Sequence, residues 1–348
     1  MWRALVLALG IAVAAGCGDD STADGADTTA DGSADASAPA TQDAGGGDDG
    51  DAPAEPATGD PSRLVGTFAV ELVEANPSTG TEALSSMRGF VRDAPVNERT
   101  VWDEIDAAGD CVLEVPSFPF CDPDCGPGRA CVAQDVCRDD PVAVDVGTVT
   151  VSGVHTAEGA MDFELTRVGP SYQPDRSIDL AYPPAPEGAE VEVQTGGGDF
   201  APFTIGSHGI APLSVNVEGS LMAEREQALS VTWEPPGPEG VSSMFALVDL
   251  SHHGGSKGRV LCELDDASGR LEIEASLVTA LIDLGTAGWP TLKLTRRSVG
   301  STVMELGRVD FSVEHGREIP LDIPGLISCT FSSECPEGES CLPTRKCG

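Results

Sequence analysis

Basic residues are scarce in this sequence. Twenty lysines and arginines stand against 57 aspartates and glutamates, which gives a formal net charge of −37. Residues 18–62 contain 12 acids and no base, and Arg3 is the only charged residue before them, so residues 63–348 alone carry −26. Such a surface repels phosphate backbones, which argues against nucleic acid as a partner. It also repels anionic lipid surfaces, which favours a body held away from the membrane. Solubility alone accounts for the charge; an electrostatic partner would be cationic or loaded with a divalent metal.

Aromatic side chains are also few, at 5% of residues, whereas glycine (41) and proline (26) are plentiful. This composition favours short strands separated by many turns. From Leu64 onward apolar and polar residues alternate, as in Phe68, Val70 and Leu72, which predicts half-buried strands and an all-β fold of packed antiparallel sheets. Further alternating runs cover Cys111–Val115, Val142–Val154, Met161–Leu165, Ala189–Val193, Leu229–Trp233, Met244–Leu250, Val260–Leu264, Leu271–Ile273, Leu292–Leu294 and Val303–Val313.

The apolar run Ala4–Ala15 follows the single positive charge of Arg3 and has about a dozen residues, too few for a membrane span but enough for the core of a signal peptide. It leads into Val13-Ala14-Ala15-Gly16-Cys17, which resembles the lipobox of bacterial lipoproteins, with Ala14 in place of the usual leucine. The resemblance implies a signal peptide at residues 1–16 and a lipid on Cys17. It also implies a place in the bacterial envelope, at the outer membrane or cell surface rather than the inner membrane. The alternative is ordinary cleavage after Ala14, which would give a soluble secreted protein.

Residues 17–61 are predicted to form a disordered acidic linker. After Cys17 they contain almost no large apolar side chain, so they cannot bury enough surface to offset the entropy of ordering. The aspartates at 24, 27, 31 and 35 lack the Asp-x-Asp-x-Asp-Gly order of a calcium loop, which favours a solvated spacer. Whether the acidic surface binds calcium stays open.

The number of cysteines, 11, is odd, and lipidation of Cys17 would leave ten that can pair. A repeat organises most of these ten. In each copy three cysteines are separated by five residues, and a fourth lies upstream, which predicts two small disulfide-rich modules. The two sets are Cys121, Cys125, Cys131 and Cys137, and Cys329, Cys335, Cys341 and Cys347.

Four cysteines allow three connectivities, of which we favour first-to-third and second-to-fourth as a hypothesis. Zinc is the alternative, but zinc ligands usually pair two to four residues apart, and most gaps here are five. Cys111 and Cys262 are left over, and they either form a bridge or stay reduced on buried strands.

The predicted organisation is a β domain at 62–186 with a cysteine-rich insert at 111–137, a β-sandwich domain at 187–322 and a cysteine-rich module at 323–348. One short helix is expected over Ser276–Leu284, ended by Gly285. Residues 228–236, Ala-Leu-Ser-Val-Thr-Trp-Glu-Pro-Pro, resemble the early strand of a fibronectin type III sandwich. The resemblance implies that the second domain is fibronectin- or immunoglobulin-like, and that Trp233 is a core residue.

The segment with most resemblance to a catalytic motif is Ser251–Gly258, which contains Gly-x-Ser-x-Gly around Ser256. A hydrolase nucleophile elbow needs a strand before it and a helix after it, whereas strands are predicted on both sides here. His252 and His253 would point to opposite faces of an extended chain, which disfavours a shared metal. We therefore expect a hairpin loop without catalytic residues, metal or cofactor. Because loops on rigid scaffolds often carry function, His252, His253 and Ser256 remain the first candidates for ligand contact.

The sequence thus predicts a lipid-anchored, non-enzymatic display or binding protein, whose further partners would be other envelope proteins or polysaccharide. One rival is an envelope hydrolase that uses the His252–Gly258 loop; nothing distinguishes a carboxylate pair such as Asp103 with Glu104 from ordinary surface charge. The other rival is a carbohydrate-binding module, in which exposed aromatic rings would stack on sugar. The rings in question are Trp102, Trp289 and Tyr172.

Overall fold

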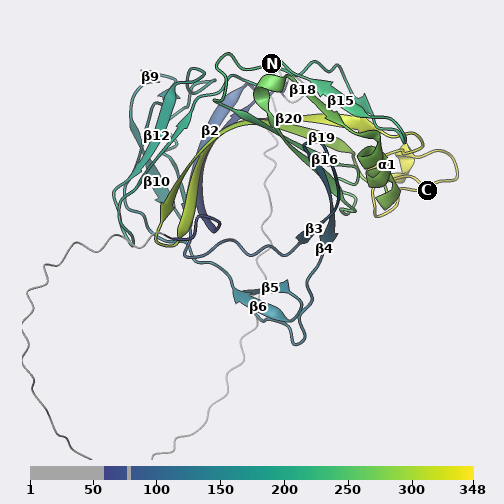
Figure 1. The fold of residues 1–348 in the computed structure, drawn as a ribbon, viewed down its shortest axis with the longest axis horizontal. Coiled ribbons are helices and arrows are strands. Elements are labelled where there is room, and N and C mark those ends of the chain that lie inside the picture. Colours follow the sequence, from purple (N-terminus) through teal and green to yellow (C-terminus); the bar gives the residue numbers. More distant parts are fainter. Residues whose placement is uncertain (1–58, 77–79) are drawn as a thin grey trace, which may run out of the picture. The chain divides into compact units, whose positions relative to one another are not determined.

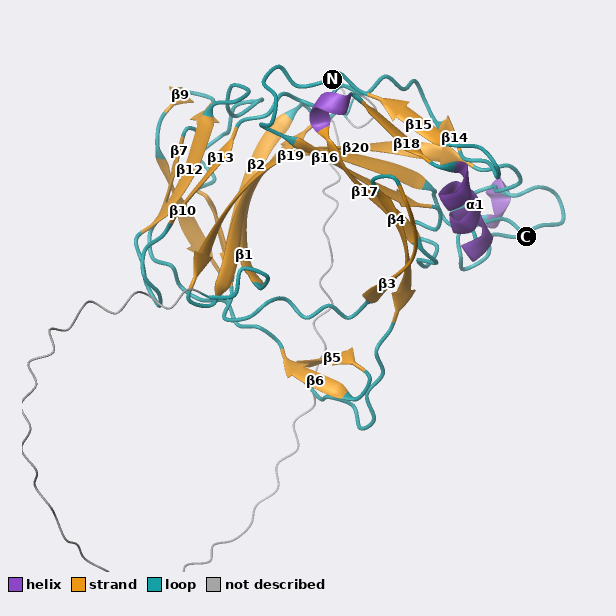
Figure 2. Ribbon diagram, viewed as in Figure 1, coloured by secondary structure: helices purple, strands orange, loops and turns teal. Residues whose placement is uncertain are grey.

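The computed structural model describes residues 59–76 and 80–348, so the predicted signal peptide, Cys17 and most of the predicted linker lie outside the described residues. Within the described part nearly every element is a strand, with one α-helix, which confirms the all-β prediction (Figure 2). The strands are β1 (Leu64–Val73), β2 (Leu84–Val91), β3 (Val101–Ala108), β4 (Cys111–Ser117), β5 (Arg129–Ala133), β6 (Val136–Asp139), β7 (Val149–Ser152), β8 (His155–Thr156), β9 (Gly159–Ala160), β10 (Phe163–Val168), β11 (Ser171–Pro174), β12 (Glu190–Thr195), β13 (Thr204–His208), β14 (Leu221–Met222), β15 (Leu229–Thr232), β16 (Ser243–Asp249), β17 (Arg259–Asp265), β18 (Arg270–Ile273), β19 (Thr291–Met304) and β20 (Gly307–Asp322). The helices are α1 (Ala275–Leu284) and the short 3₁₀ turns η1 (Asp266–Ser268) and η2 (Ser332–Glu334).

Most strands join one sheet, in the order β13-β12-β7-β10-β11-β2-β1-β20-β19-β16-β17-β4-β3. Neighbours in this order are antiparallel except β1 and β20, which run parallel with Phe68 opposite Phe311. The short strand β14 also pairs with β20, again in parallel. The sheet therefore brings the first and last long strands of the described chain together near its middle (Figure 1). Separate two-stranded ladders pair β15 with β18 and β5 with β6.

Two hydrophobic cores lie against this sheet. In the first, inward residues of β1, β2 and β20 face those of β7, β10, β12 and β13 as two packed layers (Figure 1). In the second, residues of β4, β16, β17, β19 and β20 pack against the β15–β18 ladder and the apolar side of α1. Trp233 belongs to this second core, where it is almost fully buried and its indole N–H donates to the carbonyl of Asp266 (3.0 Å), as its predicted core role requires.

The long strands β19 and β20 pass through both cores and carry polar residues at the boundary between them. Leu294 and Ile319 belong to the second core, whereas Phe311 belongs to the first. Between these positions Arg296 and His315 are opposite one another, and both side chains are buried. The boundary between the cores is therefore a polar seam inside a continuous hairpin.

Each core draws on residues from both sides of position 187, where the sequence suggested a domain boundary. Val191, Val193 and Ile205 pack in the first core, and Cys111 and Leu113 pack in the second. The described residues form one compact unit. Sequence order and packing differ here because the sheet joins strands that are distant in the chain.

Of two predictions for single elements, the helix is confirmed and one strand is wrong. The helix expected over 276–284 is confirmed as α1, and Gly285 follows it. The single strand expected over Val303–Val313 is wrong, because β19 ends at Met304 and β20 begins at Gly307, so that the alternating run spans a hairpin turn. No helix of the described residues has the length and apolar character needed to span a bilayer.

Candidate functional site

The loop predicted at residues 251–258 connects β16 to β17, which are antiparallel neighbours, so it is the tip of a β-hairpin as expected. Ser251 is buried and anchors the loop. Its backbone N–H and hydroxyl donate to Asp249 Oδ1 (2.7 and 3.0 Å), and its hydroxyl accepts the backbone N–H of Lys257 (2.9 Å). The serine that carries the hydrogen bonds is therefore Ser251, and its role is to hold the turn.

The geometry of a hydrolase is not found in this loop. Ser256 is followed by a strand, so the helix that a nucleophile elbow needs does not come after it. Within the described part of the chain, no hydrogen bond connects His252 or His253 to Ser256 or to a carboxylate. A serine nucleophile needs a base within hydrogen-bond reach that is itself held by a third group, and these residues do not form such a chain.

The two histidines differ from the sequence expectation because the chain turns at this point. His253 has a positive φ of 58°, so neighbouring side chains no longer alternate as they would in a strand. The two imidazole rings lie 3.9 Å apart between centroids and are tilted by 52°. The His253 ring in turn meets Trp289 edge-on, at 6.1 Å and 73°. The turn thus gathers three rings in one place.

Two other segments pack against this loop. The segment 285–290 follows α1. The backbone N–H of Trp289 donates to the carbonyl of His252 (2.9 Å), and the backbone N–H of Ala287 donates to the carbonyl of Leu250 (3.0 Å). The C-terminal cysteine module contributes the carbonyl of Thr344, which accepts the Gly288 N–H (2.9 Å). The loop is therefore part of a junction of three segments rather than an isolated hairpin.

Glycine permits the close approach. A Cβ at Gly254 would lie 2.6 Å from the Cβ of Ala287 and 2.7 Å from the carbonyl oxygen of Thr344. Because any larger residue would separate the loop from both neighbours, the Gly-x-Ser-x-Gly pattern serves packing at its first glycine. The sequence motif thus has a structural reason that does not involve catalysis.

Two lysines border the same junction. The ammonium of Lys346 donates to the carbonyl of Thr286 (3.2 Å), and the side chain of Lys257 runs beside Gly285. The whole chain has only three lysines and five histidines, so two of each occur here. We call this surface, formed by His252, His253, Lys257, Trp289 and Lys346, the His–Trp corner.

The three aromatic residues considered for sugar binding have different surroundings. Tyr172 is buried, and its hydroxyl donates to Asp145 and accepts the Val146 N–H, which fixes it as a core residue. Trp102 is half-buried beneath the guanidinium of Arg259, 3.8 Å above its ring. Trp289 is 36% exposed. Trp289 is therefore the most exposed of the three.

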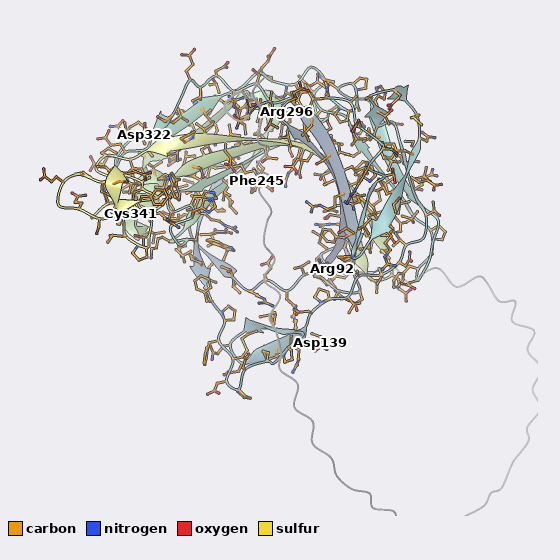
Figure 3. All side chains as sticks on the ribbon, turned by 180° about the vertical axis from the view of Figure 1, so that it is seen from behind. Arg92, Asp139, Phe245, Arg296, Asp322 and Cys341 are labelled. Carbon is orange, nitrogen blue, oxygen red and sulfur yellow. A yellow bond between two sulfur atoms is a disulfide. The ribbon has the colours of Figure 1, made fainter. Side chains whose placement is uncertain are left out.

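The face of the sheet turned away from the cores also carries aromatic residues. Phe245 and Arg92, labelled in Figure 3, project from this face. Each ring here lies under an arginine: the pairs are Arg92 on Phe90, Arg259 on Trp102 and Arg297 on Phe245. Glutamates hold the second and third arginines. Because arginine covers the apolar rings, this arrangement accounts for the solubility of an open sheet face.

Asp103 and Glu104, the acid pair singled out as an example, are exposed neighbours on the edge strand β3. Side chains at adjacent strand positions point to opposite faces, so these two carboxylates do not share a site. Charged residues on an edge strand discourage pairing with other chains, which accounts for them structurally.

The described residues contain ten of the eleven cysteines, and all ten form disulfides. Both modules have first-to-third and second-to-fourth pairing, the favoured connectivity: Cys121–Cys131, Cys125–Cys137, Cys329–Cys341 and Cys335–Cys347. Cys111 and Cys262 are opposite one another on β4 and β17 and are also bridged, which resolves the open alternative in favour of a bond. Thiolates for the zinc alternative are thus not available in either module. Cys17 and the aspartates at 24, 27, 31 and 35 lie outside the described residues.

Comparison with known proteins identifies no family. No protein-family model matches the sequence, and no curated protein matches it. A solved structure, the two fibronectin type III domain segment from chicken tenascin, aligns at 12% identity with a TM-score of 0.18, covering 64% of this chain and 99% of that one. A TM-score of 0.18 is too low to equate the two folds, and the all-β architecture rests on the strand pairings described above.

Sequence reasoning missed several members of the candidate site. Lys346 lies in the last module and Lys257 in the hairpin loop, and nothing in their local sequences indicates that they border the same junction. The one available signal is compositional: lysine is so rare in this chain that each occurrence merits attention. Trp289 was named only as a sugar-stacking candidate, without a link to the histidines.

Proposed function

We propose that this chain is a lipid-anchored, extracytoplasmic display or binding protein of the bacterial envelope, at the outer membrane or cell surface, and that it has no catalytic activity. The observation that carries the proposal is the cysteine count. All ten cysteines of the described residues pair with one another. Disulfides persist in oxidising compartments, which supports export. No cysteine of the chain is left to pair with Cys17, which is consistent with its lipidation.

The absence of catalysis is proposed from the geometry of the one loop that resembles a catalytic motif. Ser256 precedes a strand, and the hydroxyl of Ser251 is used to hold the turn. The three-segment junction around the loop supports a rigid surface for contact with another molecule. Function carried by a loop on a fixed scaffold is a common arrangement in β proteins.

Mass spectrometry of the native, non-reduced protein from the producing bacterium tests the anchor. We expect an N-terminus at Cys17 that carries a lipid, with five disulfides connected as above. Cys17→Ala should lose both the lipid mass and cleavage before residue 17, whereas Ser21→Ala, a matched change in the linker, should mature normally. An unmodified N-terminus at Ala15, or recovery of the chain in the cytoplasm with its leader intact, would refute the anchor.

A further inference from the structure

We propose that a cleft on the open face of the sheet binds a short peptide with free termini. The ammonium group of the peptide would lie between Glu71 and Glu314, and its carboxylate would lie near the guanidinium groups of Arg88 and Arg92. The proposal goes beyond the display or binding role above and rests on it only for the claim that the body binds a ligand. It does not depend on the lipid anchor.

The cleft lies on the concave side of the sheet, where β1, β2 and β20 are neighbours (Figure 1). Alternate residues of β2 line it, because side chains two positions apart on a strand point to the same face. The lining includes Ser86, Arg88, Phe90 and Arg92 of β2, Glu71 of β1 and Glu314 of β20. A volume of about 340 Å³ is at the lower end of the range for small-molecule sites, which suits a short peptide.

The acidic end of the cleft has two like charges side by side. Glu71 and Glu314 are opposite one another on β1 and β20, and within the described residues neither forms an ion pair. Burial and the charge of Glu71 raise the pKa of Glu314 above its usual value, whereas Lys293 and Arg297 lower it from a greater distance. Like charges at directly opposite positions destabilise a sheet. A bound ammonium group would relieve this repulsion.

The basic end of the cleft has two arginines without carboxylate partners. Within the described part of the chain, neither Arg88 nor Arg92 forms an ion pair, and the Arg92 guanidinium lies 5.1 Å from the centre of the Phe90 ring. The other two arginines that cover rings on this face are each held by a glutamate (2.6 and 2.7 Å). The guanidinium groups at this end are therefore available to a carboxylate, which a guanidinium can bind through two parallel hydrogen bonds.

The separation of the two ends matches the length of a short peptide. On β2, Ser86 is opposite Glu71, and Phe90, which the Arg92 guanidinium covers, follows four residues later. At about 3.4 Å per residue, the acidic and basic ends are roughly 13 Å apart along the strand, and long side chains shorten the gap. An extended tripeptide spans about 10 Å. A tripeptide therefore fits both ends better than a single amino acid does.

Net charge favours such a ligand. Residues 63–348 carry −26, so the body repels anions. A peptide with one ammonium group and one carboxylate is neutral overall, so the body does not repel it, and inside the cleft each of its charges meets the opposite charge. A purely anionic ligand would meet Glu71 and Glu314, and a purely cationic ligand would meet the two arginines. Charge complementarity thus selects a peptide with both termini free.

The test is saturation-transfer difference NMR of the purified full chain with three forms of one peptide. The forms are trialanine with free termini, N-acetyl-trialanine and trialanine amide. We expect a dissociation constant of about 1 mM for trialanine, because the charges of the cleft are partly exposed to solvent. Removal of either terminal charge should weaken binding about tenfold, as for the loss of a charge-assisted hydrogen bond. Added salt should weaken the binding of trialanine as well.

Two variants assign the ends of the peptide. Glu71→Gln should weaken trialanine binding about tenfold but leave N-acetyl-trialanine unchanged, because that peptide has no ammonium group. Arg88→Gln combined with Arg92→Gln should weaken trialanine binding about tenfold but leave trialanine amide unchanged. Glu71 is exposed, and its replacement removes one of two opposed like charges, so the variant should fold normally. Thermal unfolding checks this.

Matched controls exist outside the cleft. Arg270→Gln and Glu272→Gln change an exposed ion pair on β18. Neither should alter the binding of trialanine. Cys17→Ala should also bind trialanine normally, so that failure of the anchor and failure of the peptide site are distinguishable.

Four results would overturn the proposal. The first is no binding of trialanine at about 10 mM, ten times the expected dissociation constant. The second is binding of either capped peptide as strong as that of trialanine. The others are equal effects of Glu71→Gln and Glu272→Gln, or unchanged binding of trialanine by the double arginine variant.

Discussion

Arg296 and Asp266 form an ion pair that is almost fully enclosed, with side-chain exposures of 2% and 0%. Two hydrogen bonds join the guanidinium to the carboxylate (2.6 and 3.0 Å), and Arg296 also donates to the carbonyl of Glu234 (2.6 Å). Ser242 donates to the same carboxylate (2.6 Å). A buried pair of this kind gives little net stability compared with apolar residues, but the loss of one partner leaves the other charge uncompensated.

Asp266→Asn should therefore lower the free energy of unfolding by about 3–5 kcal/mol. The exposed pair of Arg225 with Asp283 offers a matched control, since its side chains are 57% and 59% exposed. Asp283→Asn should cost about 0–1 kcal/mol. Urea titration of the two variants and the parent chain measures both changes. Equal unfolding midpoints for Asp266→Asn and Asp283→Asn would show that the buried ion pair contributes no more to stability than the exposed pair does.

His315 lies in the same seam and gives the fold a dependence on pH. Its Nδ1 accepts the N–H of Leu213 (2.6 Å), while its Nε2 is buried without a hydrogen-bond partner. Burial lowers the pKa of His315 from its usual value of 6.5; Glu74 opposes this change, and Arg296 and Arg317 add to it. Above pH 6.5 both the folded and the unfolded chain hold a neutral imidazole. Below it the unfolded chain takes up the proton first, so the unfolding free energy falls as the pH falls.

His315→Asn keeps an acceptor for Leu213 but cannot titrate, so it should reduce this loss. Between pH 6.5 and 5 the parent chain should lose more stability than the variant, by up to about 1.4 kcal/mol per pH unit for a single group. Urea titrations across this range measure the difference, with His208→Asn, at an exposed position on β13, as control. Parallel pH profiles for the parent chain and His315→Asn would contradict this account.

At the scale of elements, alternation predicts strands wherever one face is buried and the other is solvated, as in β1, β16 and β17. The strand β2 was missed because Arg88 and Gly89 interrupt its apolar pattern; Gly89 lies under the ring of Phe68, where a side chain would not fit. Alternation predicts that a segment forms a strand, but it does not predict which strand pairs with it. Nothing local to β1 indicates that its parallel neighbour is β20, more than two hundred residues later.

In the candidate site, too, local features could be predicted from the sequence and long-range contacts could not. The hairpin between β16 and β17 and the two cysteine modules could be predicted, since each depends on spacing within a short segment. The position of the C-terminal module could not, because it is set by contacts such as that of Thr344 with Gly288, which join parts of the chain unrelated in sequence. The sequence thus identified the loop and the tryptophan separately but not the surface that they form together.

At the scale of the whole molecule, one covalent bond fixes the order of the sheet near its edge. The strands β3 and β4 follow β1 and β2 in sequence but join the sheet beside β17. Their ladder with β17 is short, from Arg259 opposite Glu114 to Cys262 opposite Cys111. The disulfide between these cysteines closes a sequence separation of 151 residues and is buried in the second core. It therefore ties the early part of the chain to the late part where few hydrogen bonds do so.

Replacement of both cysteines, Cys111→Ala with Cys262→Ala, should lower the free energy of unfolding by about 3–5 kcal/mol, because a long closed loop restricts the unfolded chain strongly. The matched control is Cys335→Ala with Cys347→Ala, which opens a loop with a separation of 12 residues in the C-terminal module. The same entropy reasoning gives about 3 kcal/mol at most for that loop. Because the module has little core of its own, its loss should loosen the module locally and shift the global transition less. Guanidinium titration without reductant measures the global change, and limited proteolysis reports local opening. A core double variant as stable as the parent chain would mean that the β4–β17 ladder holds the edge without covalent help.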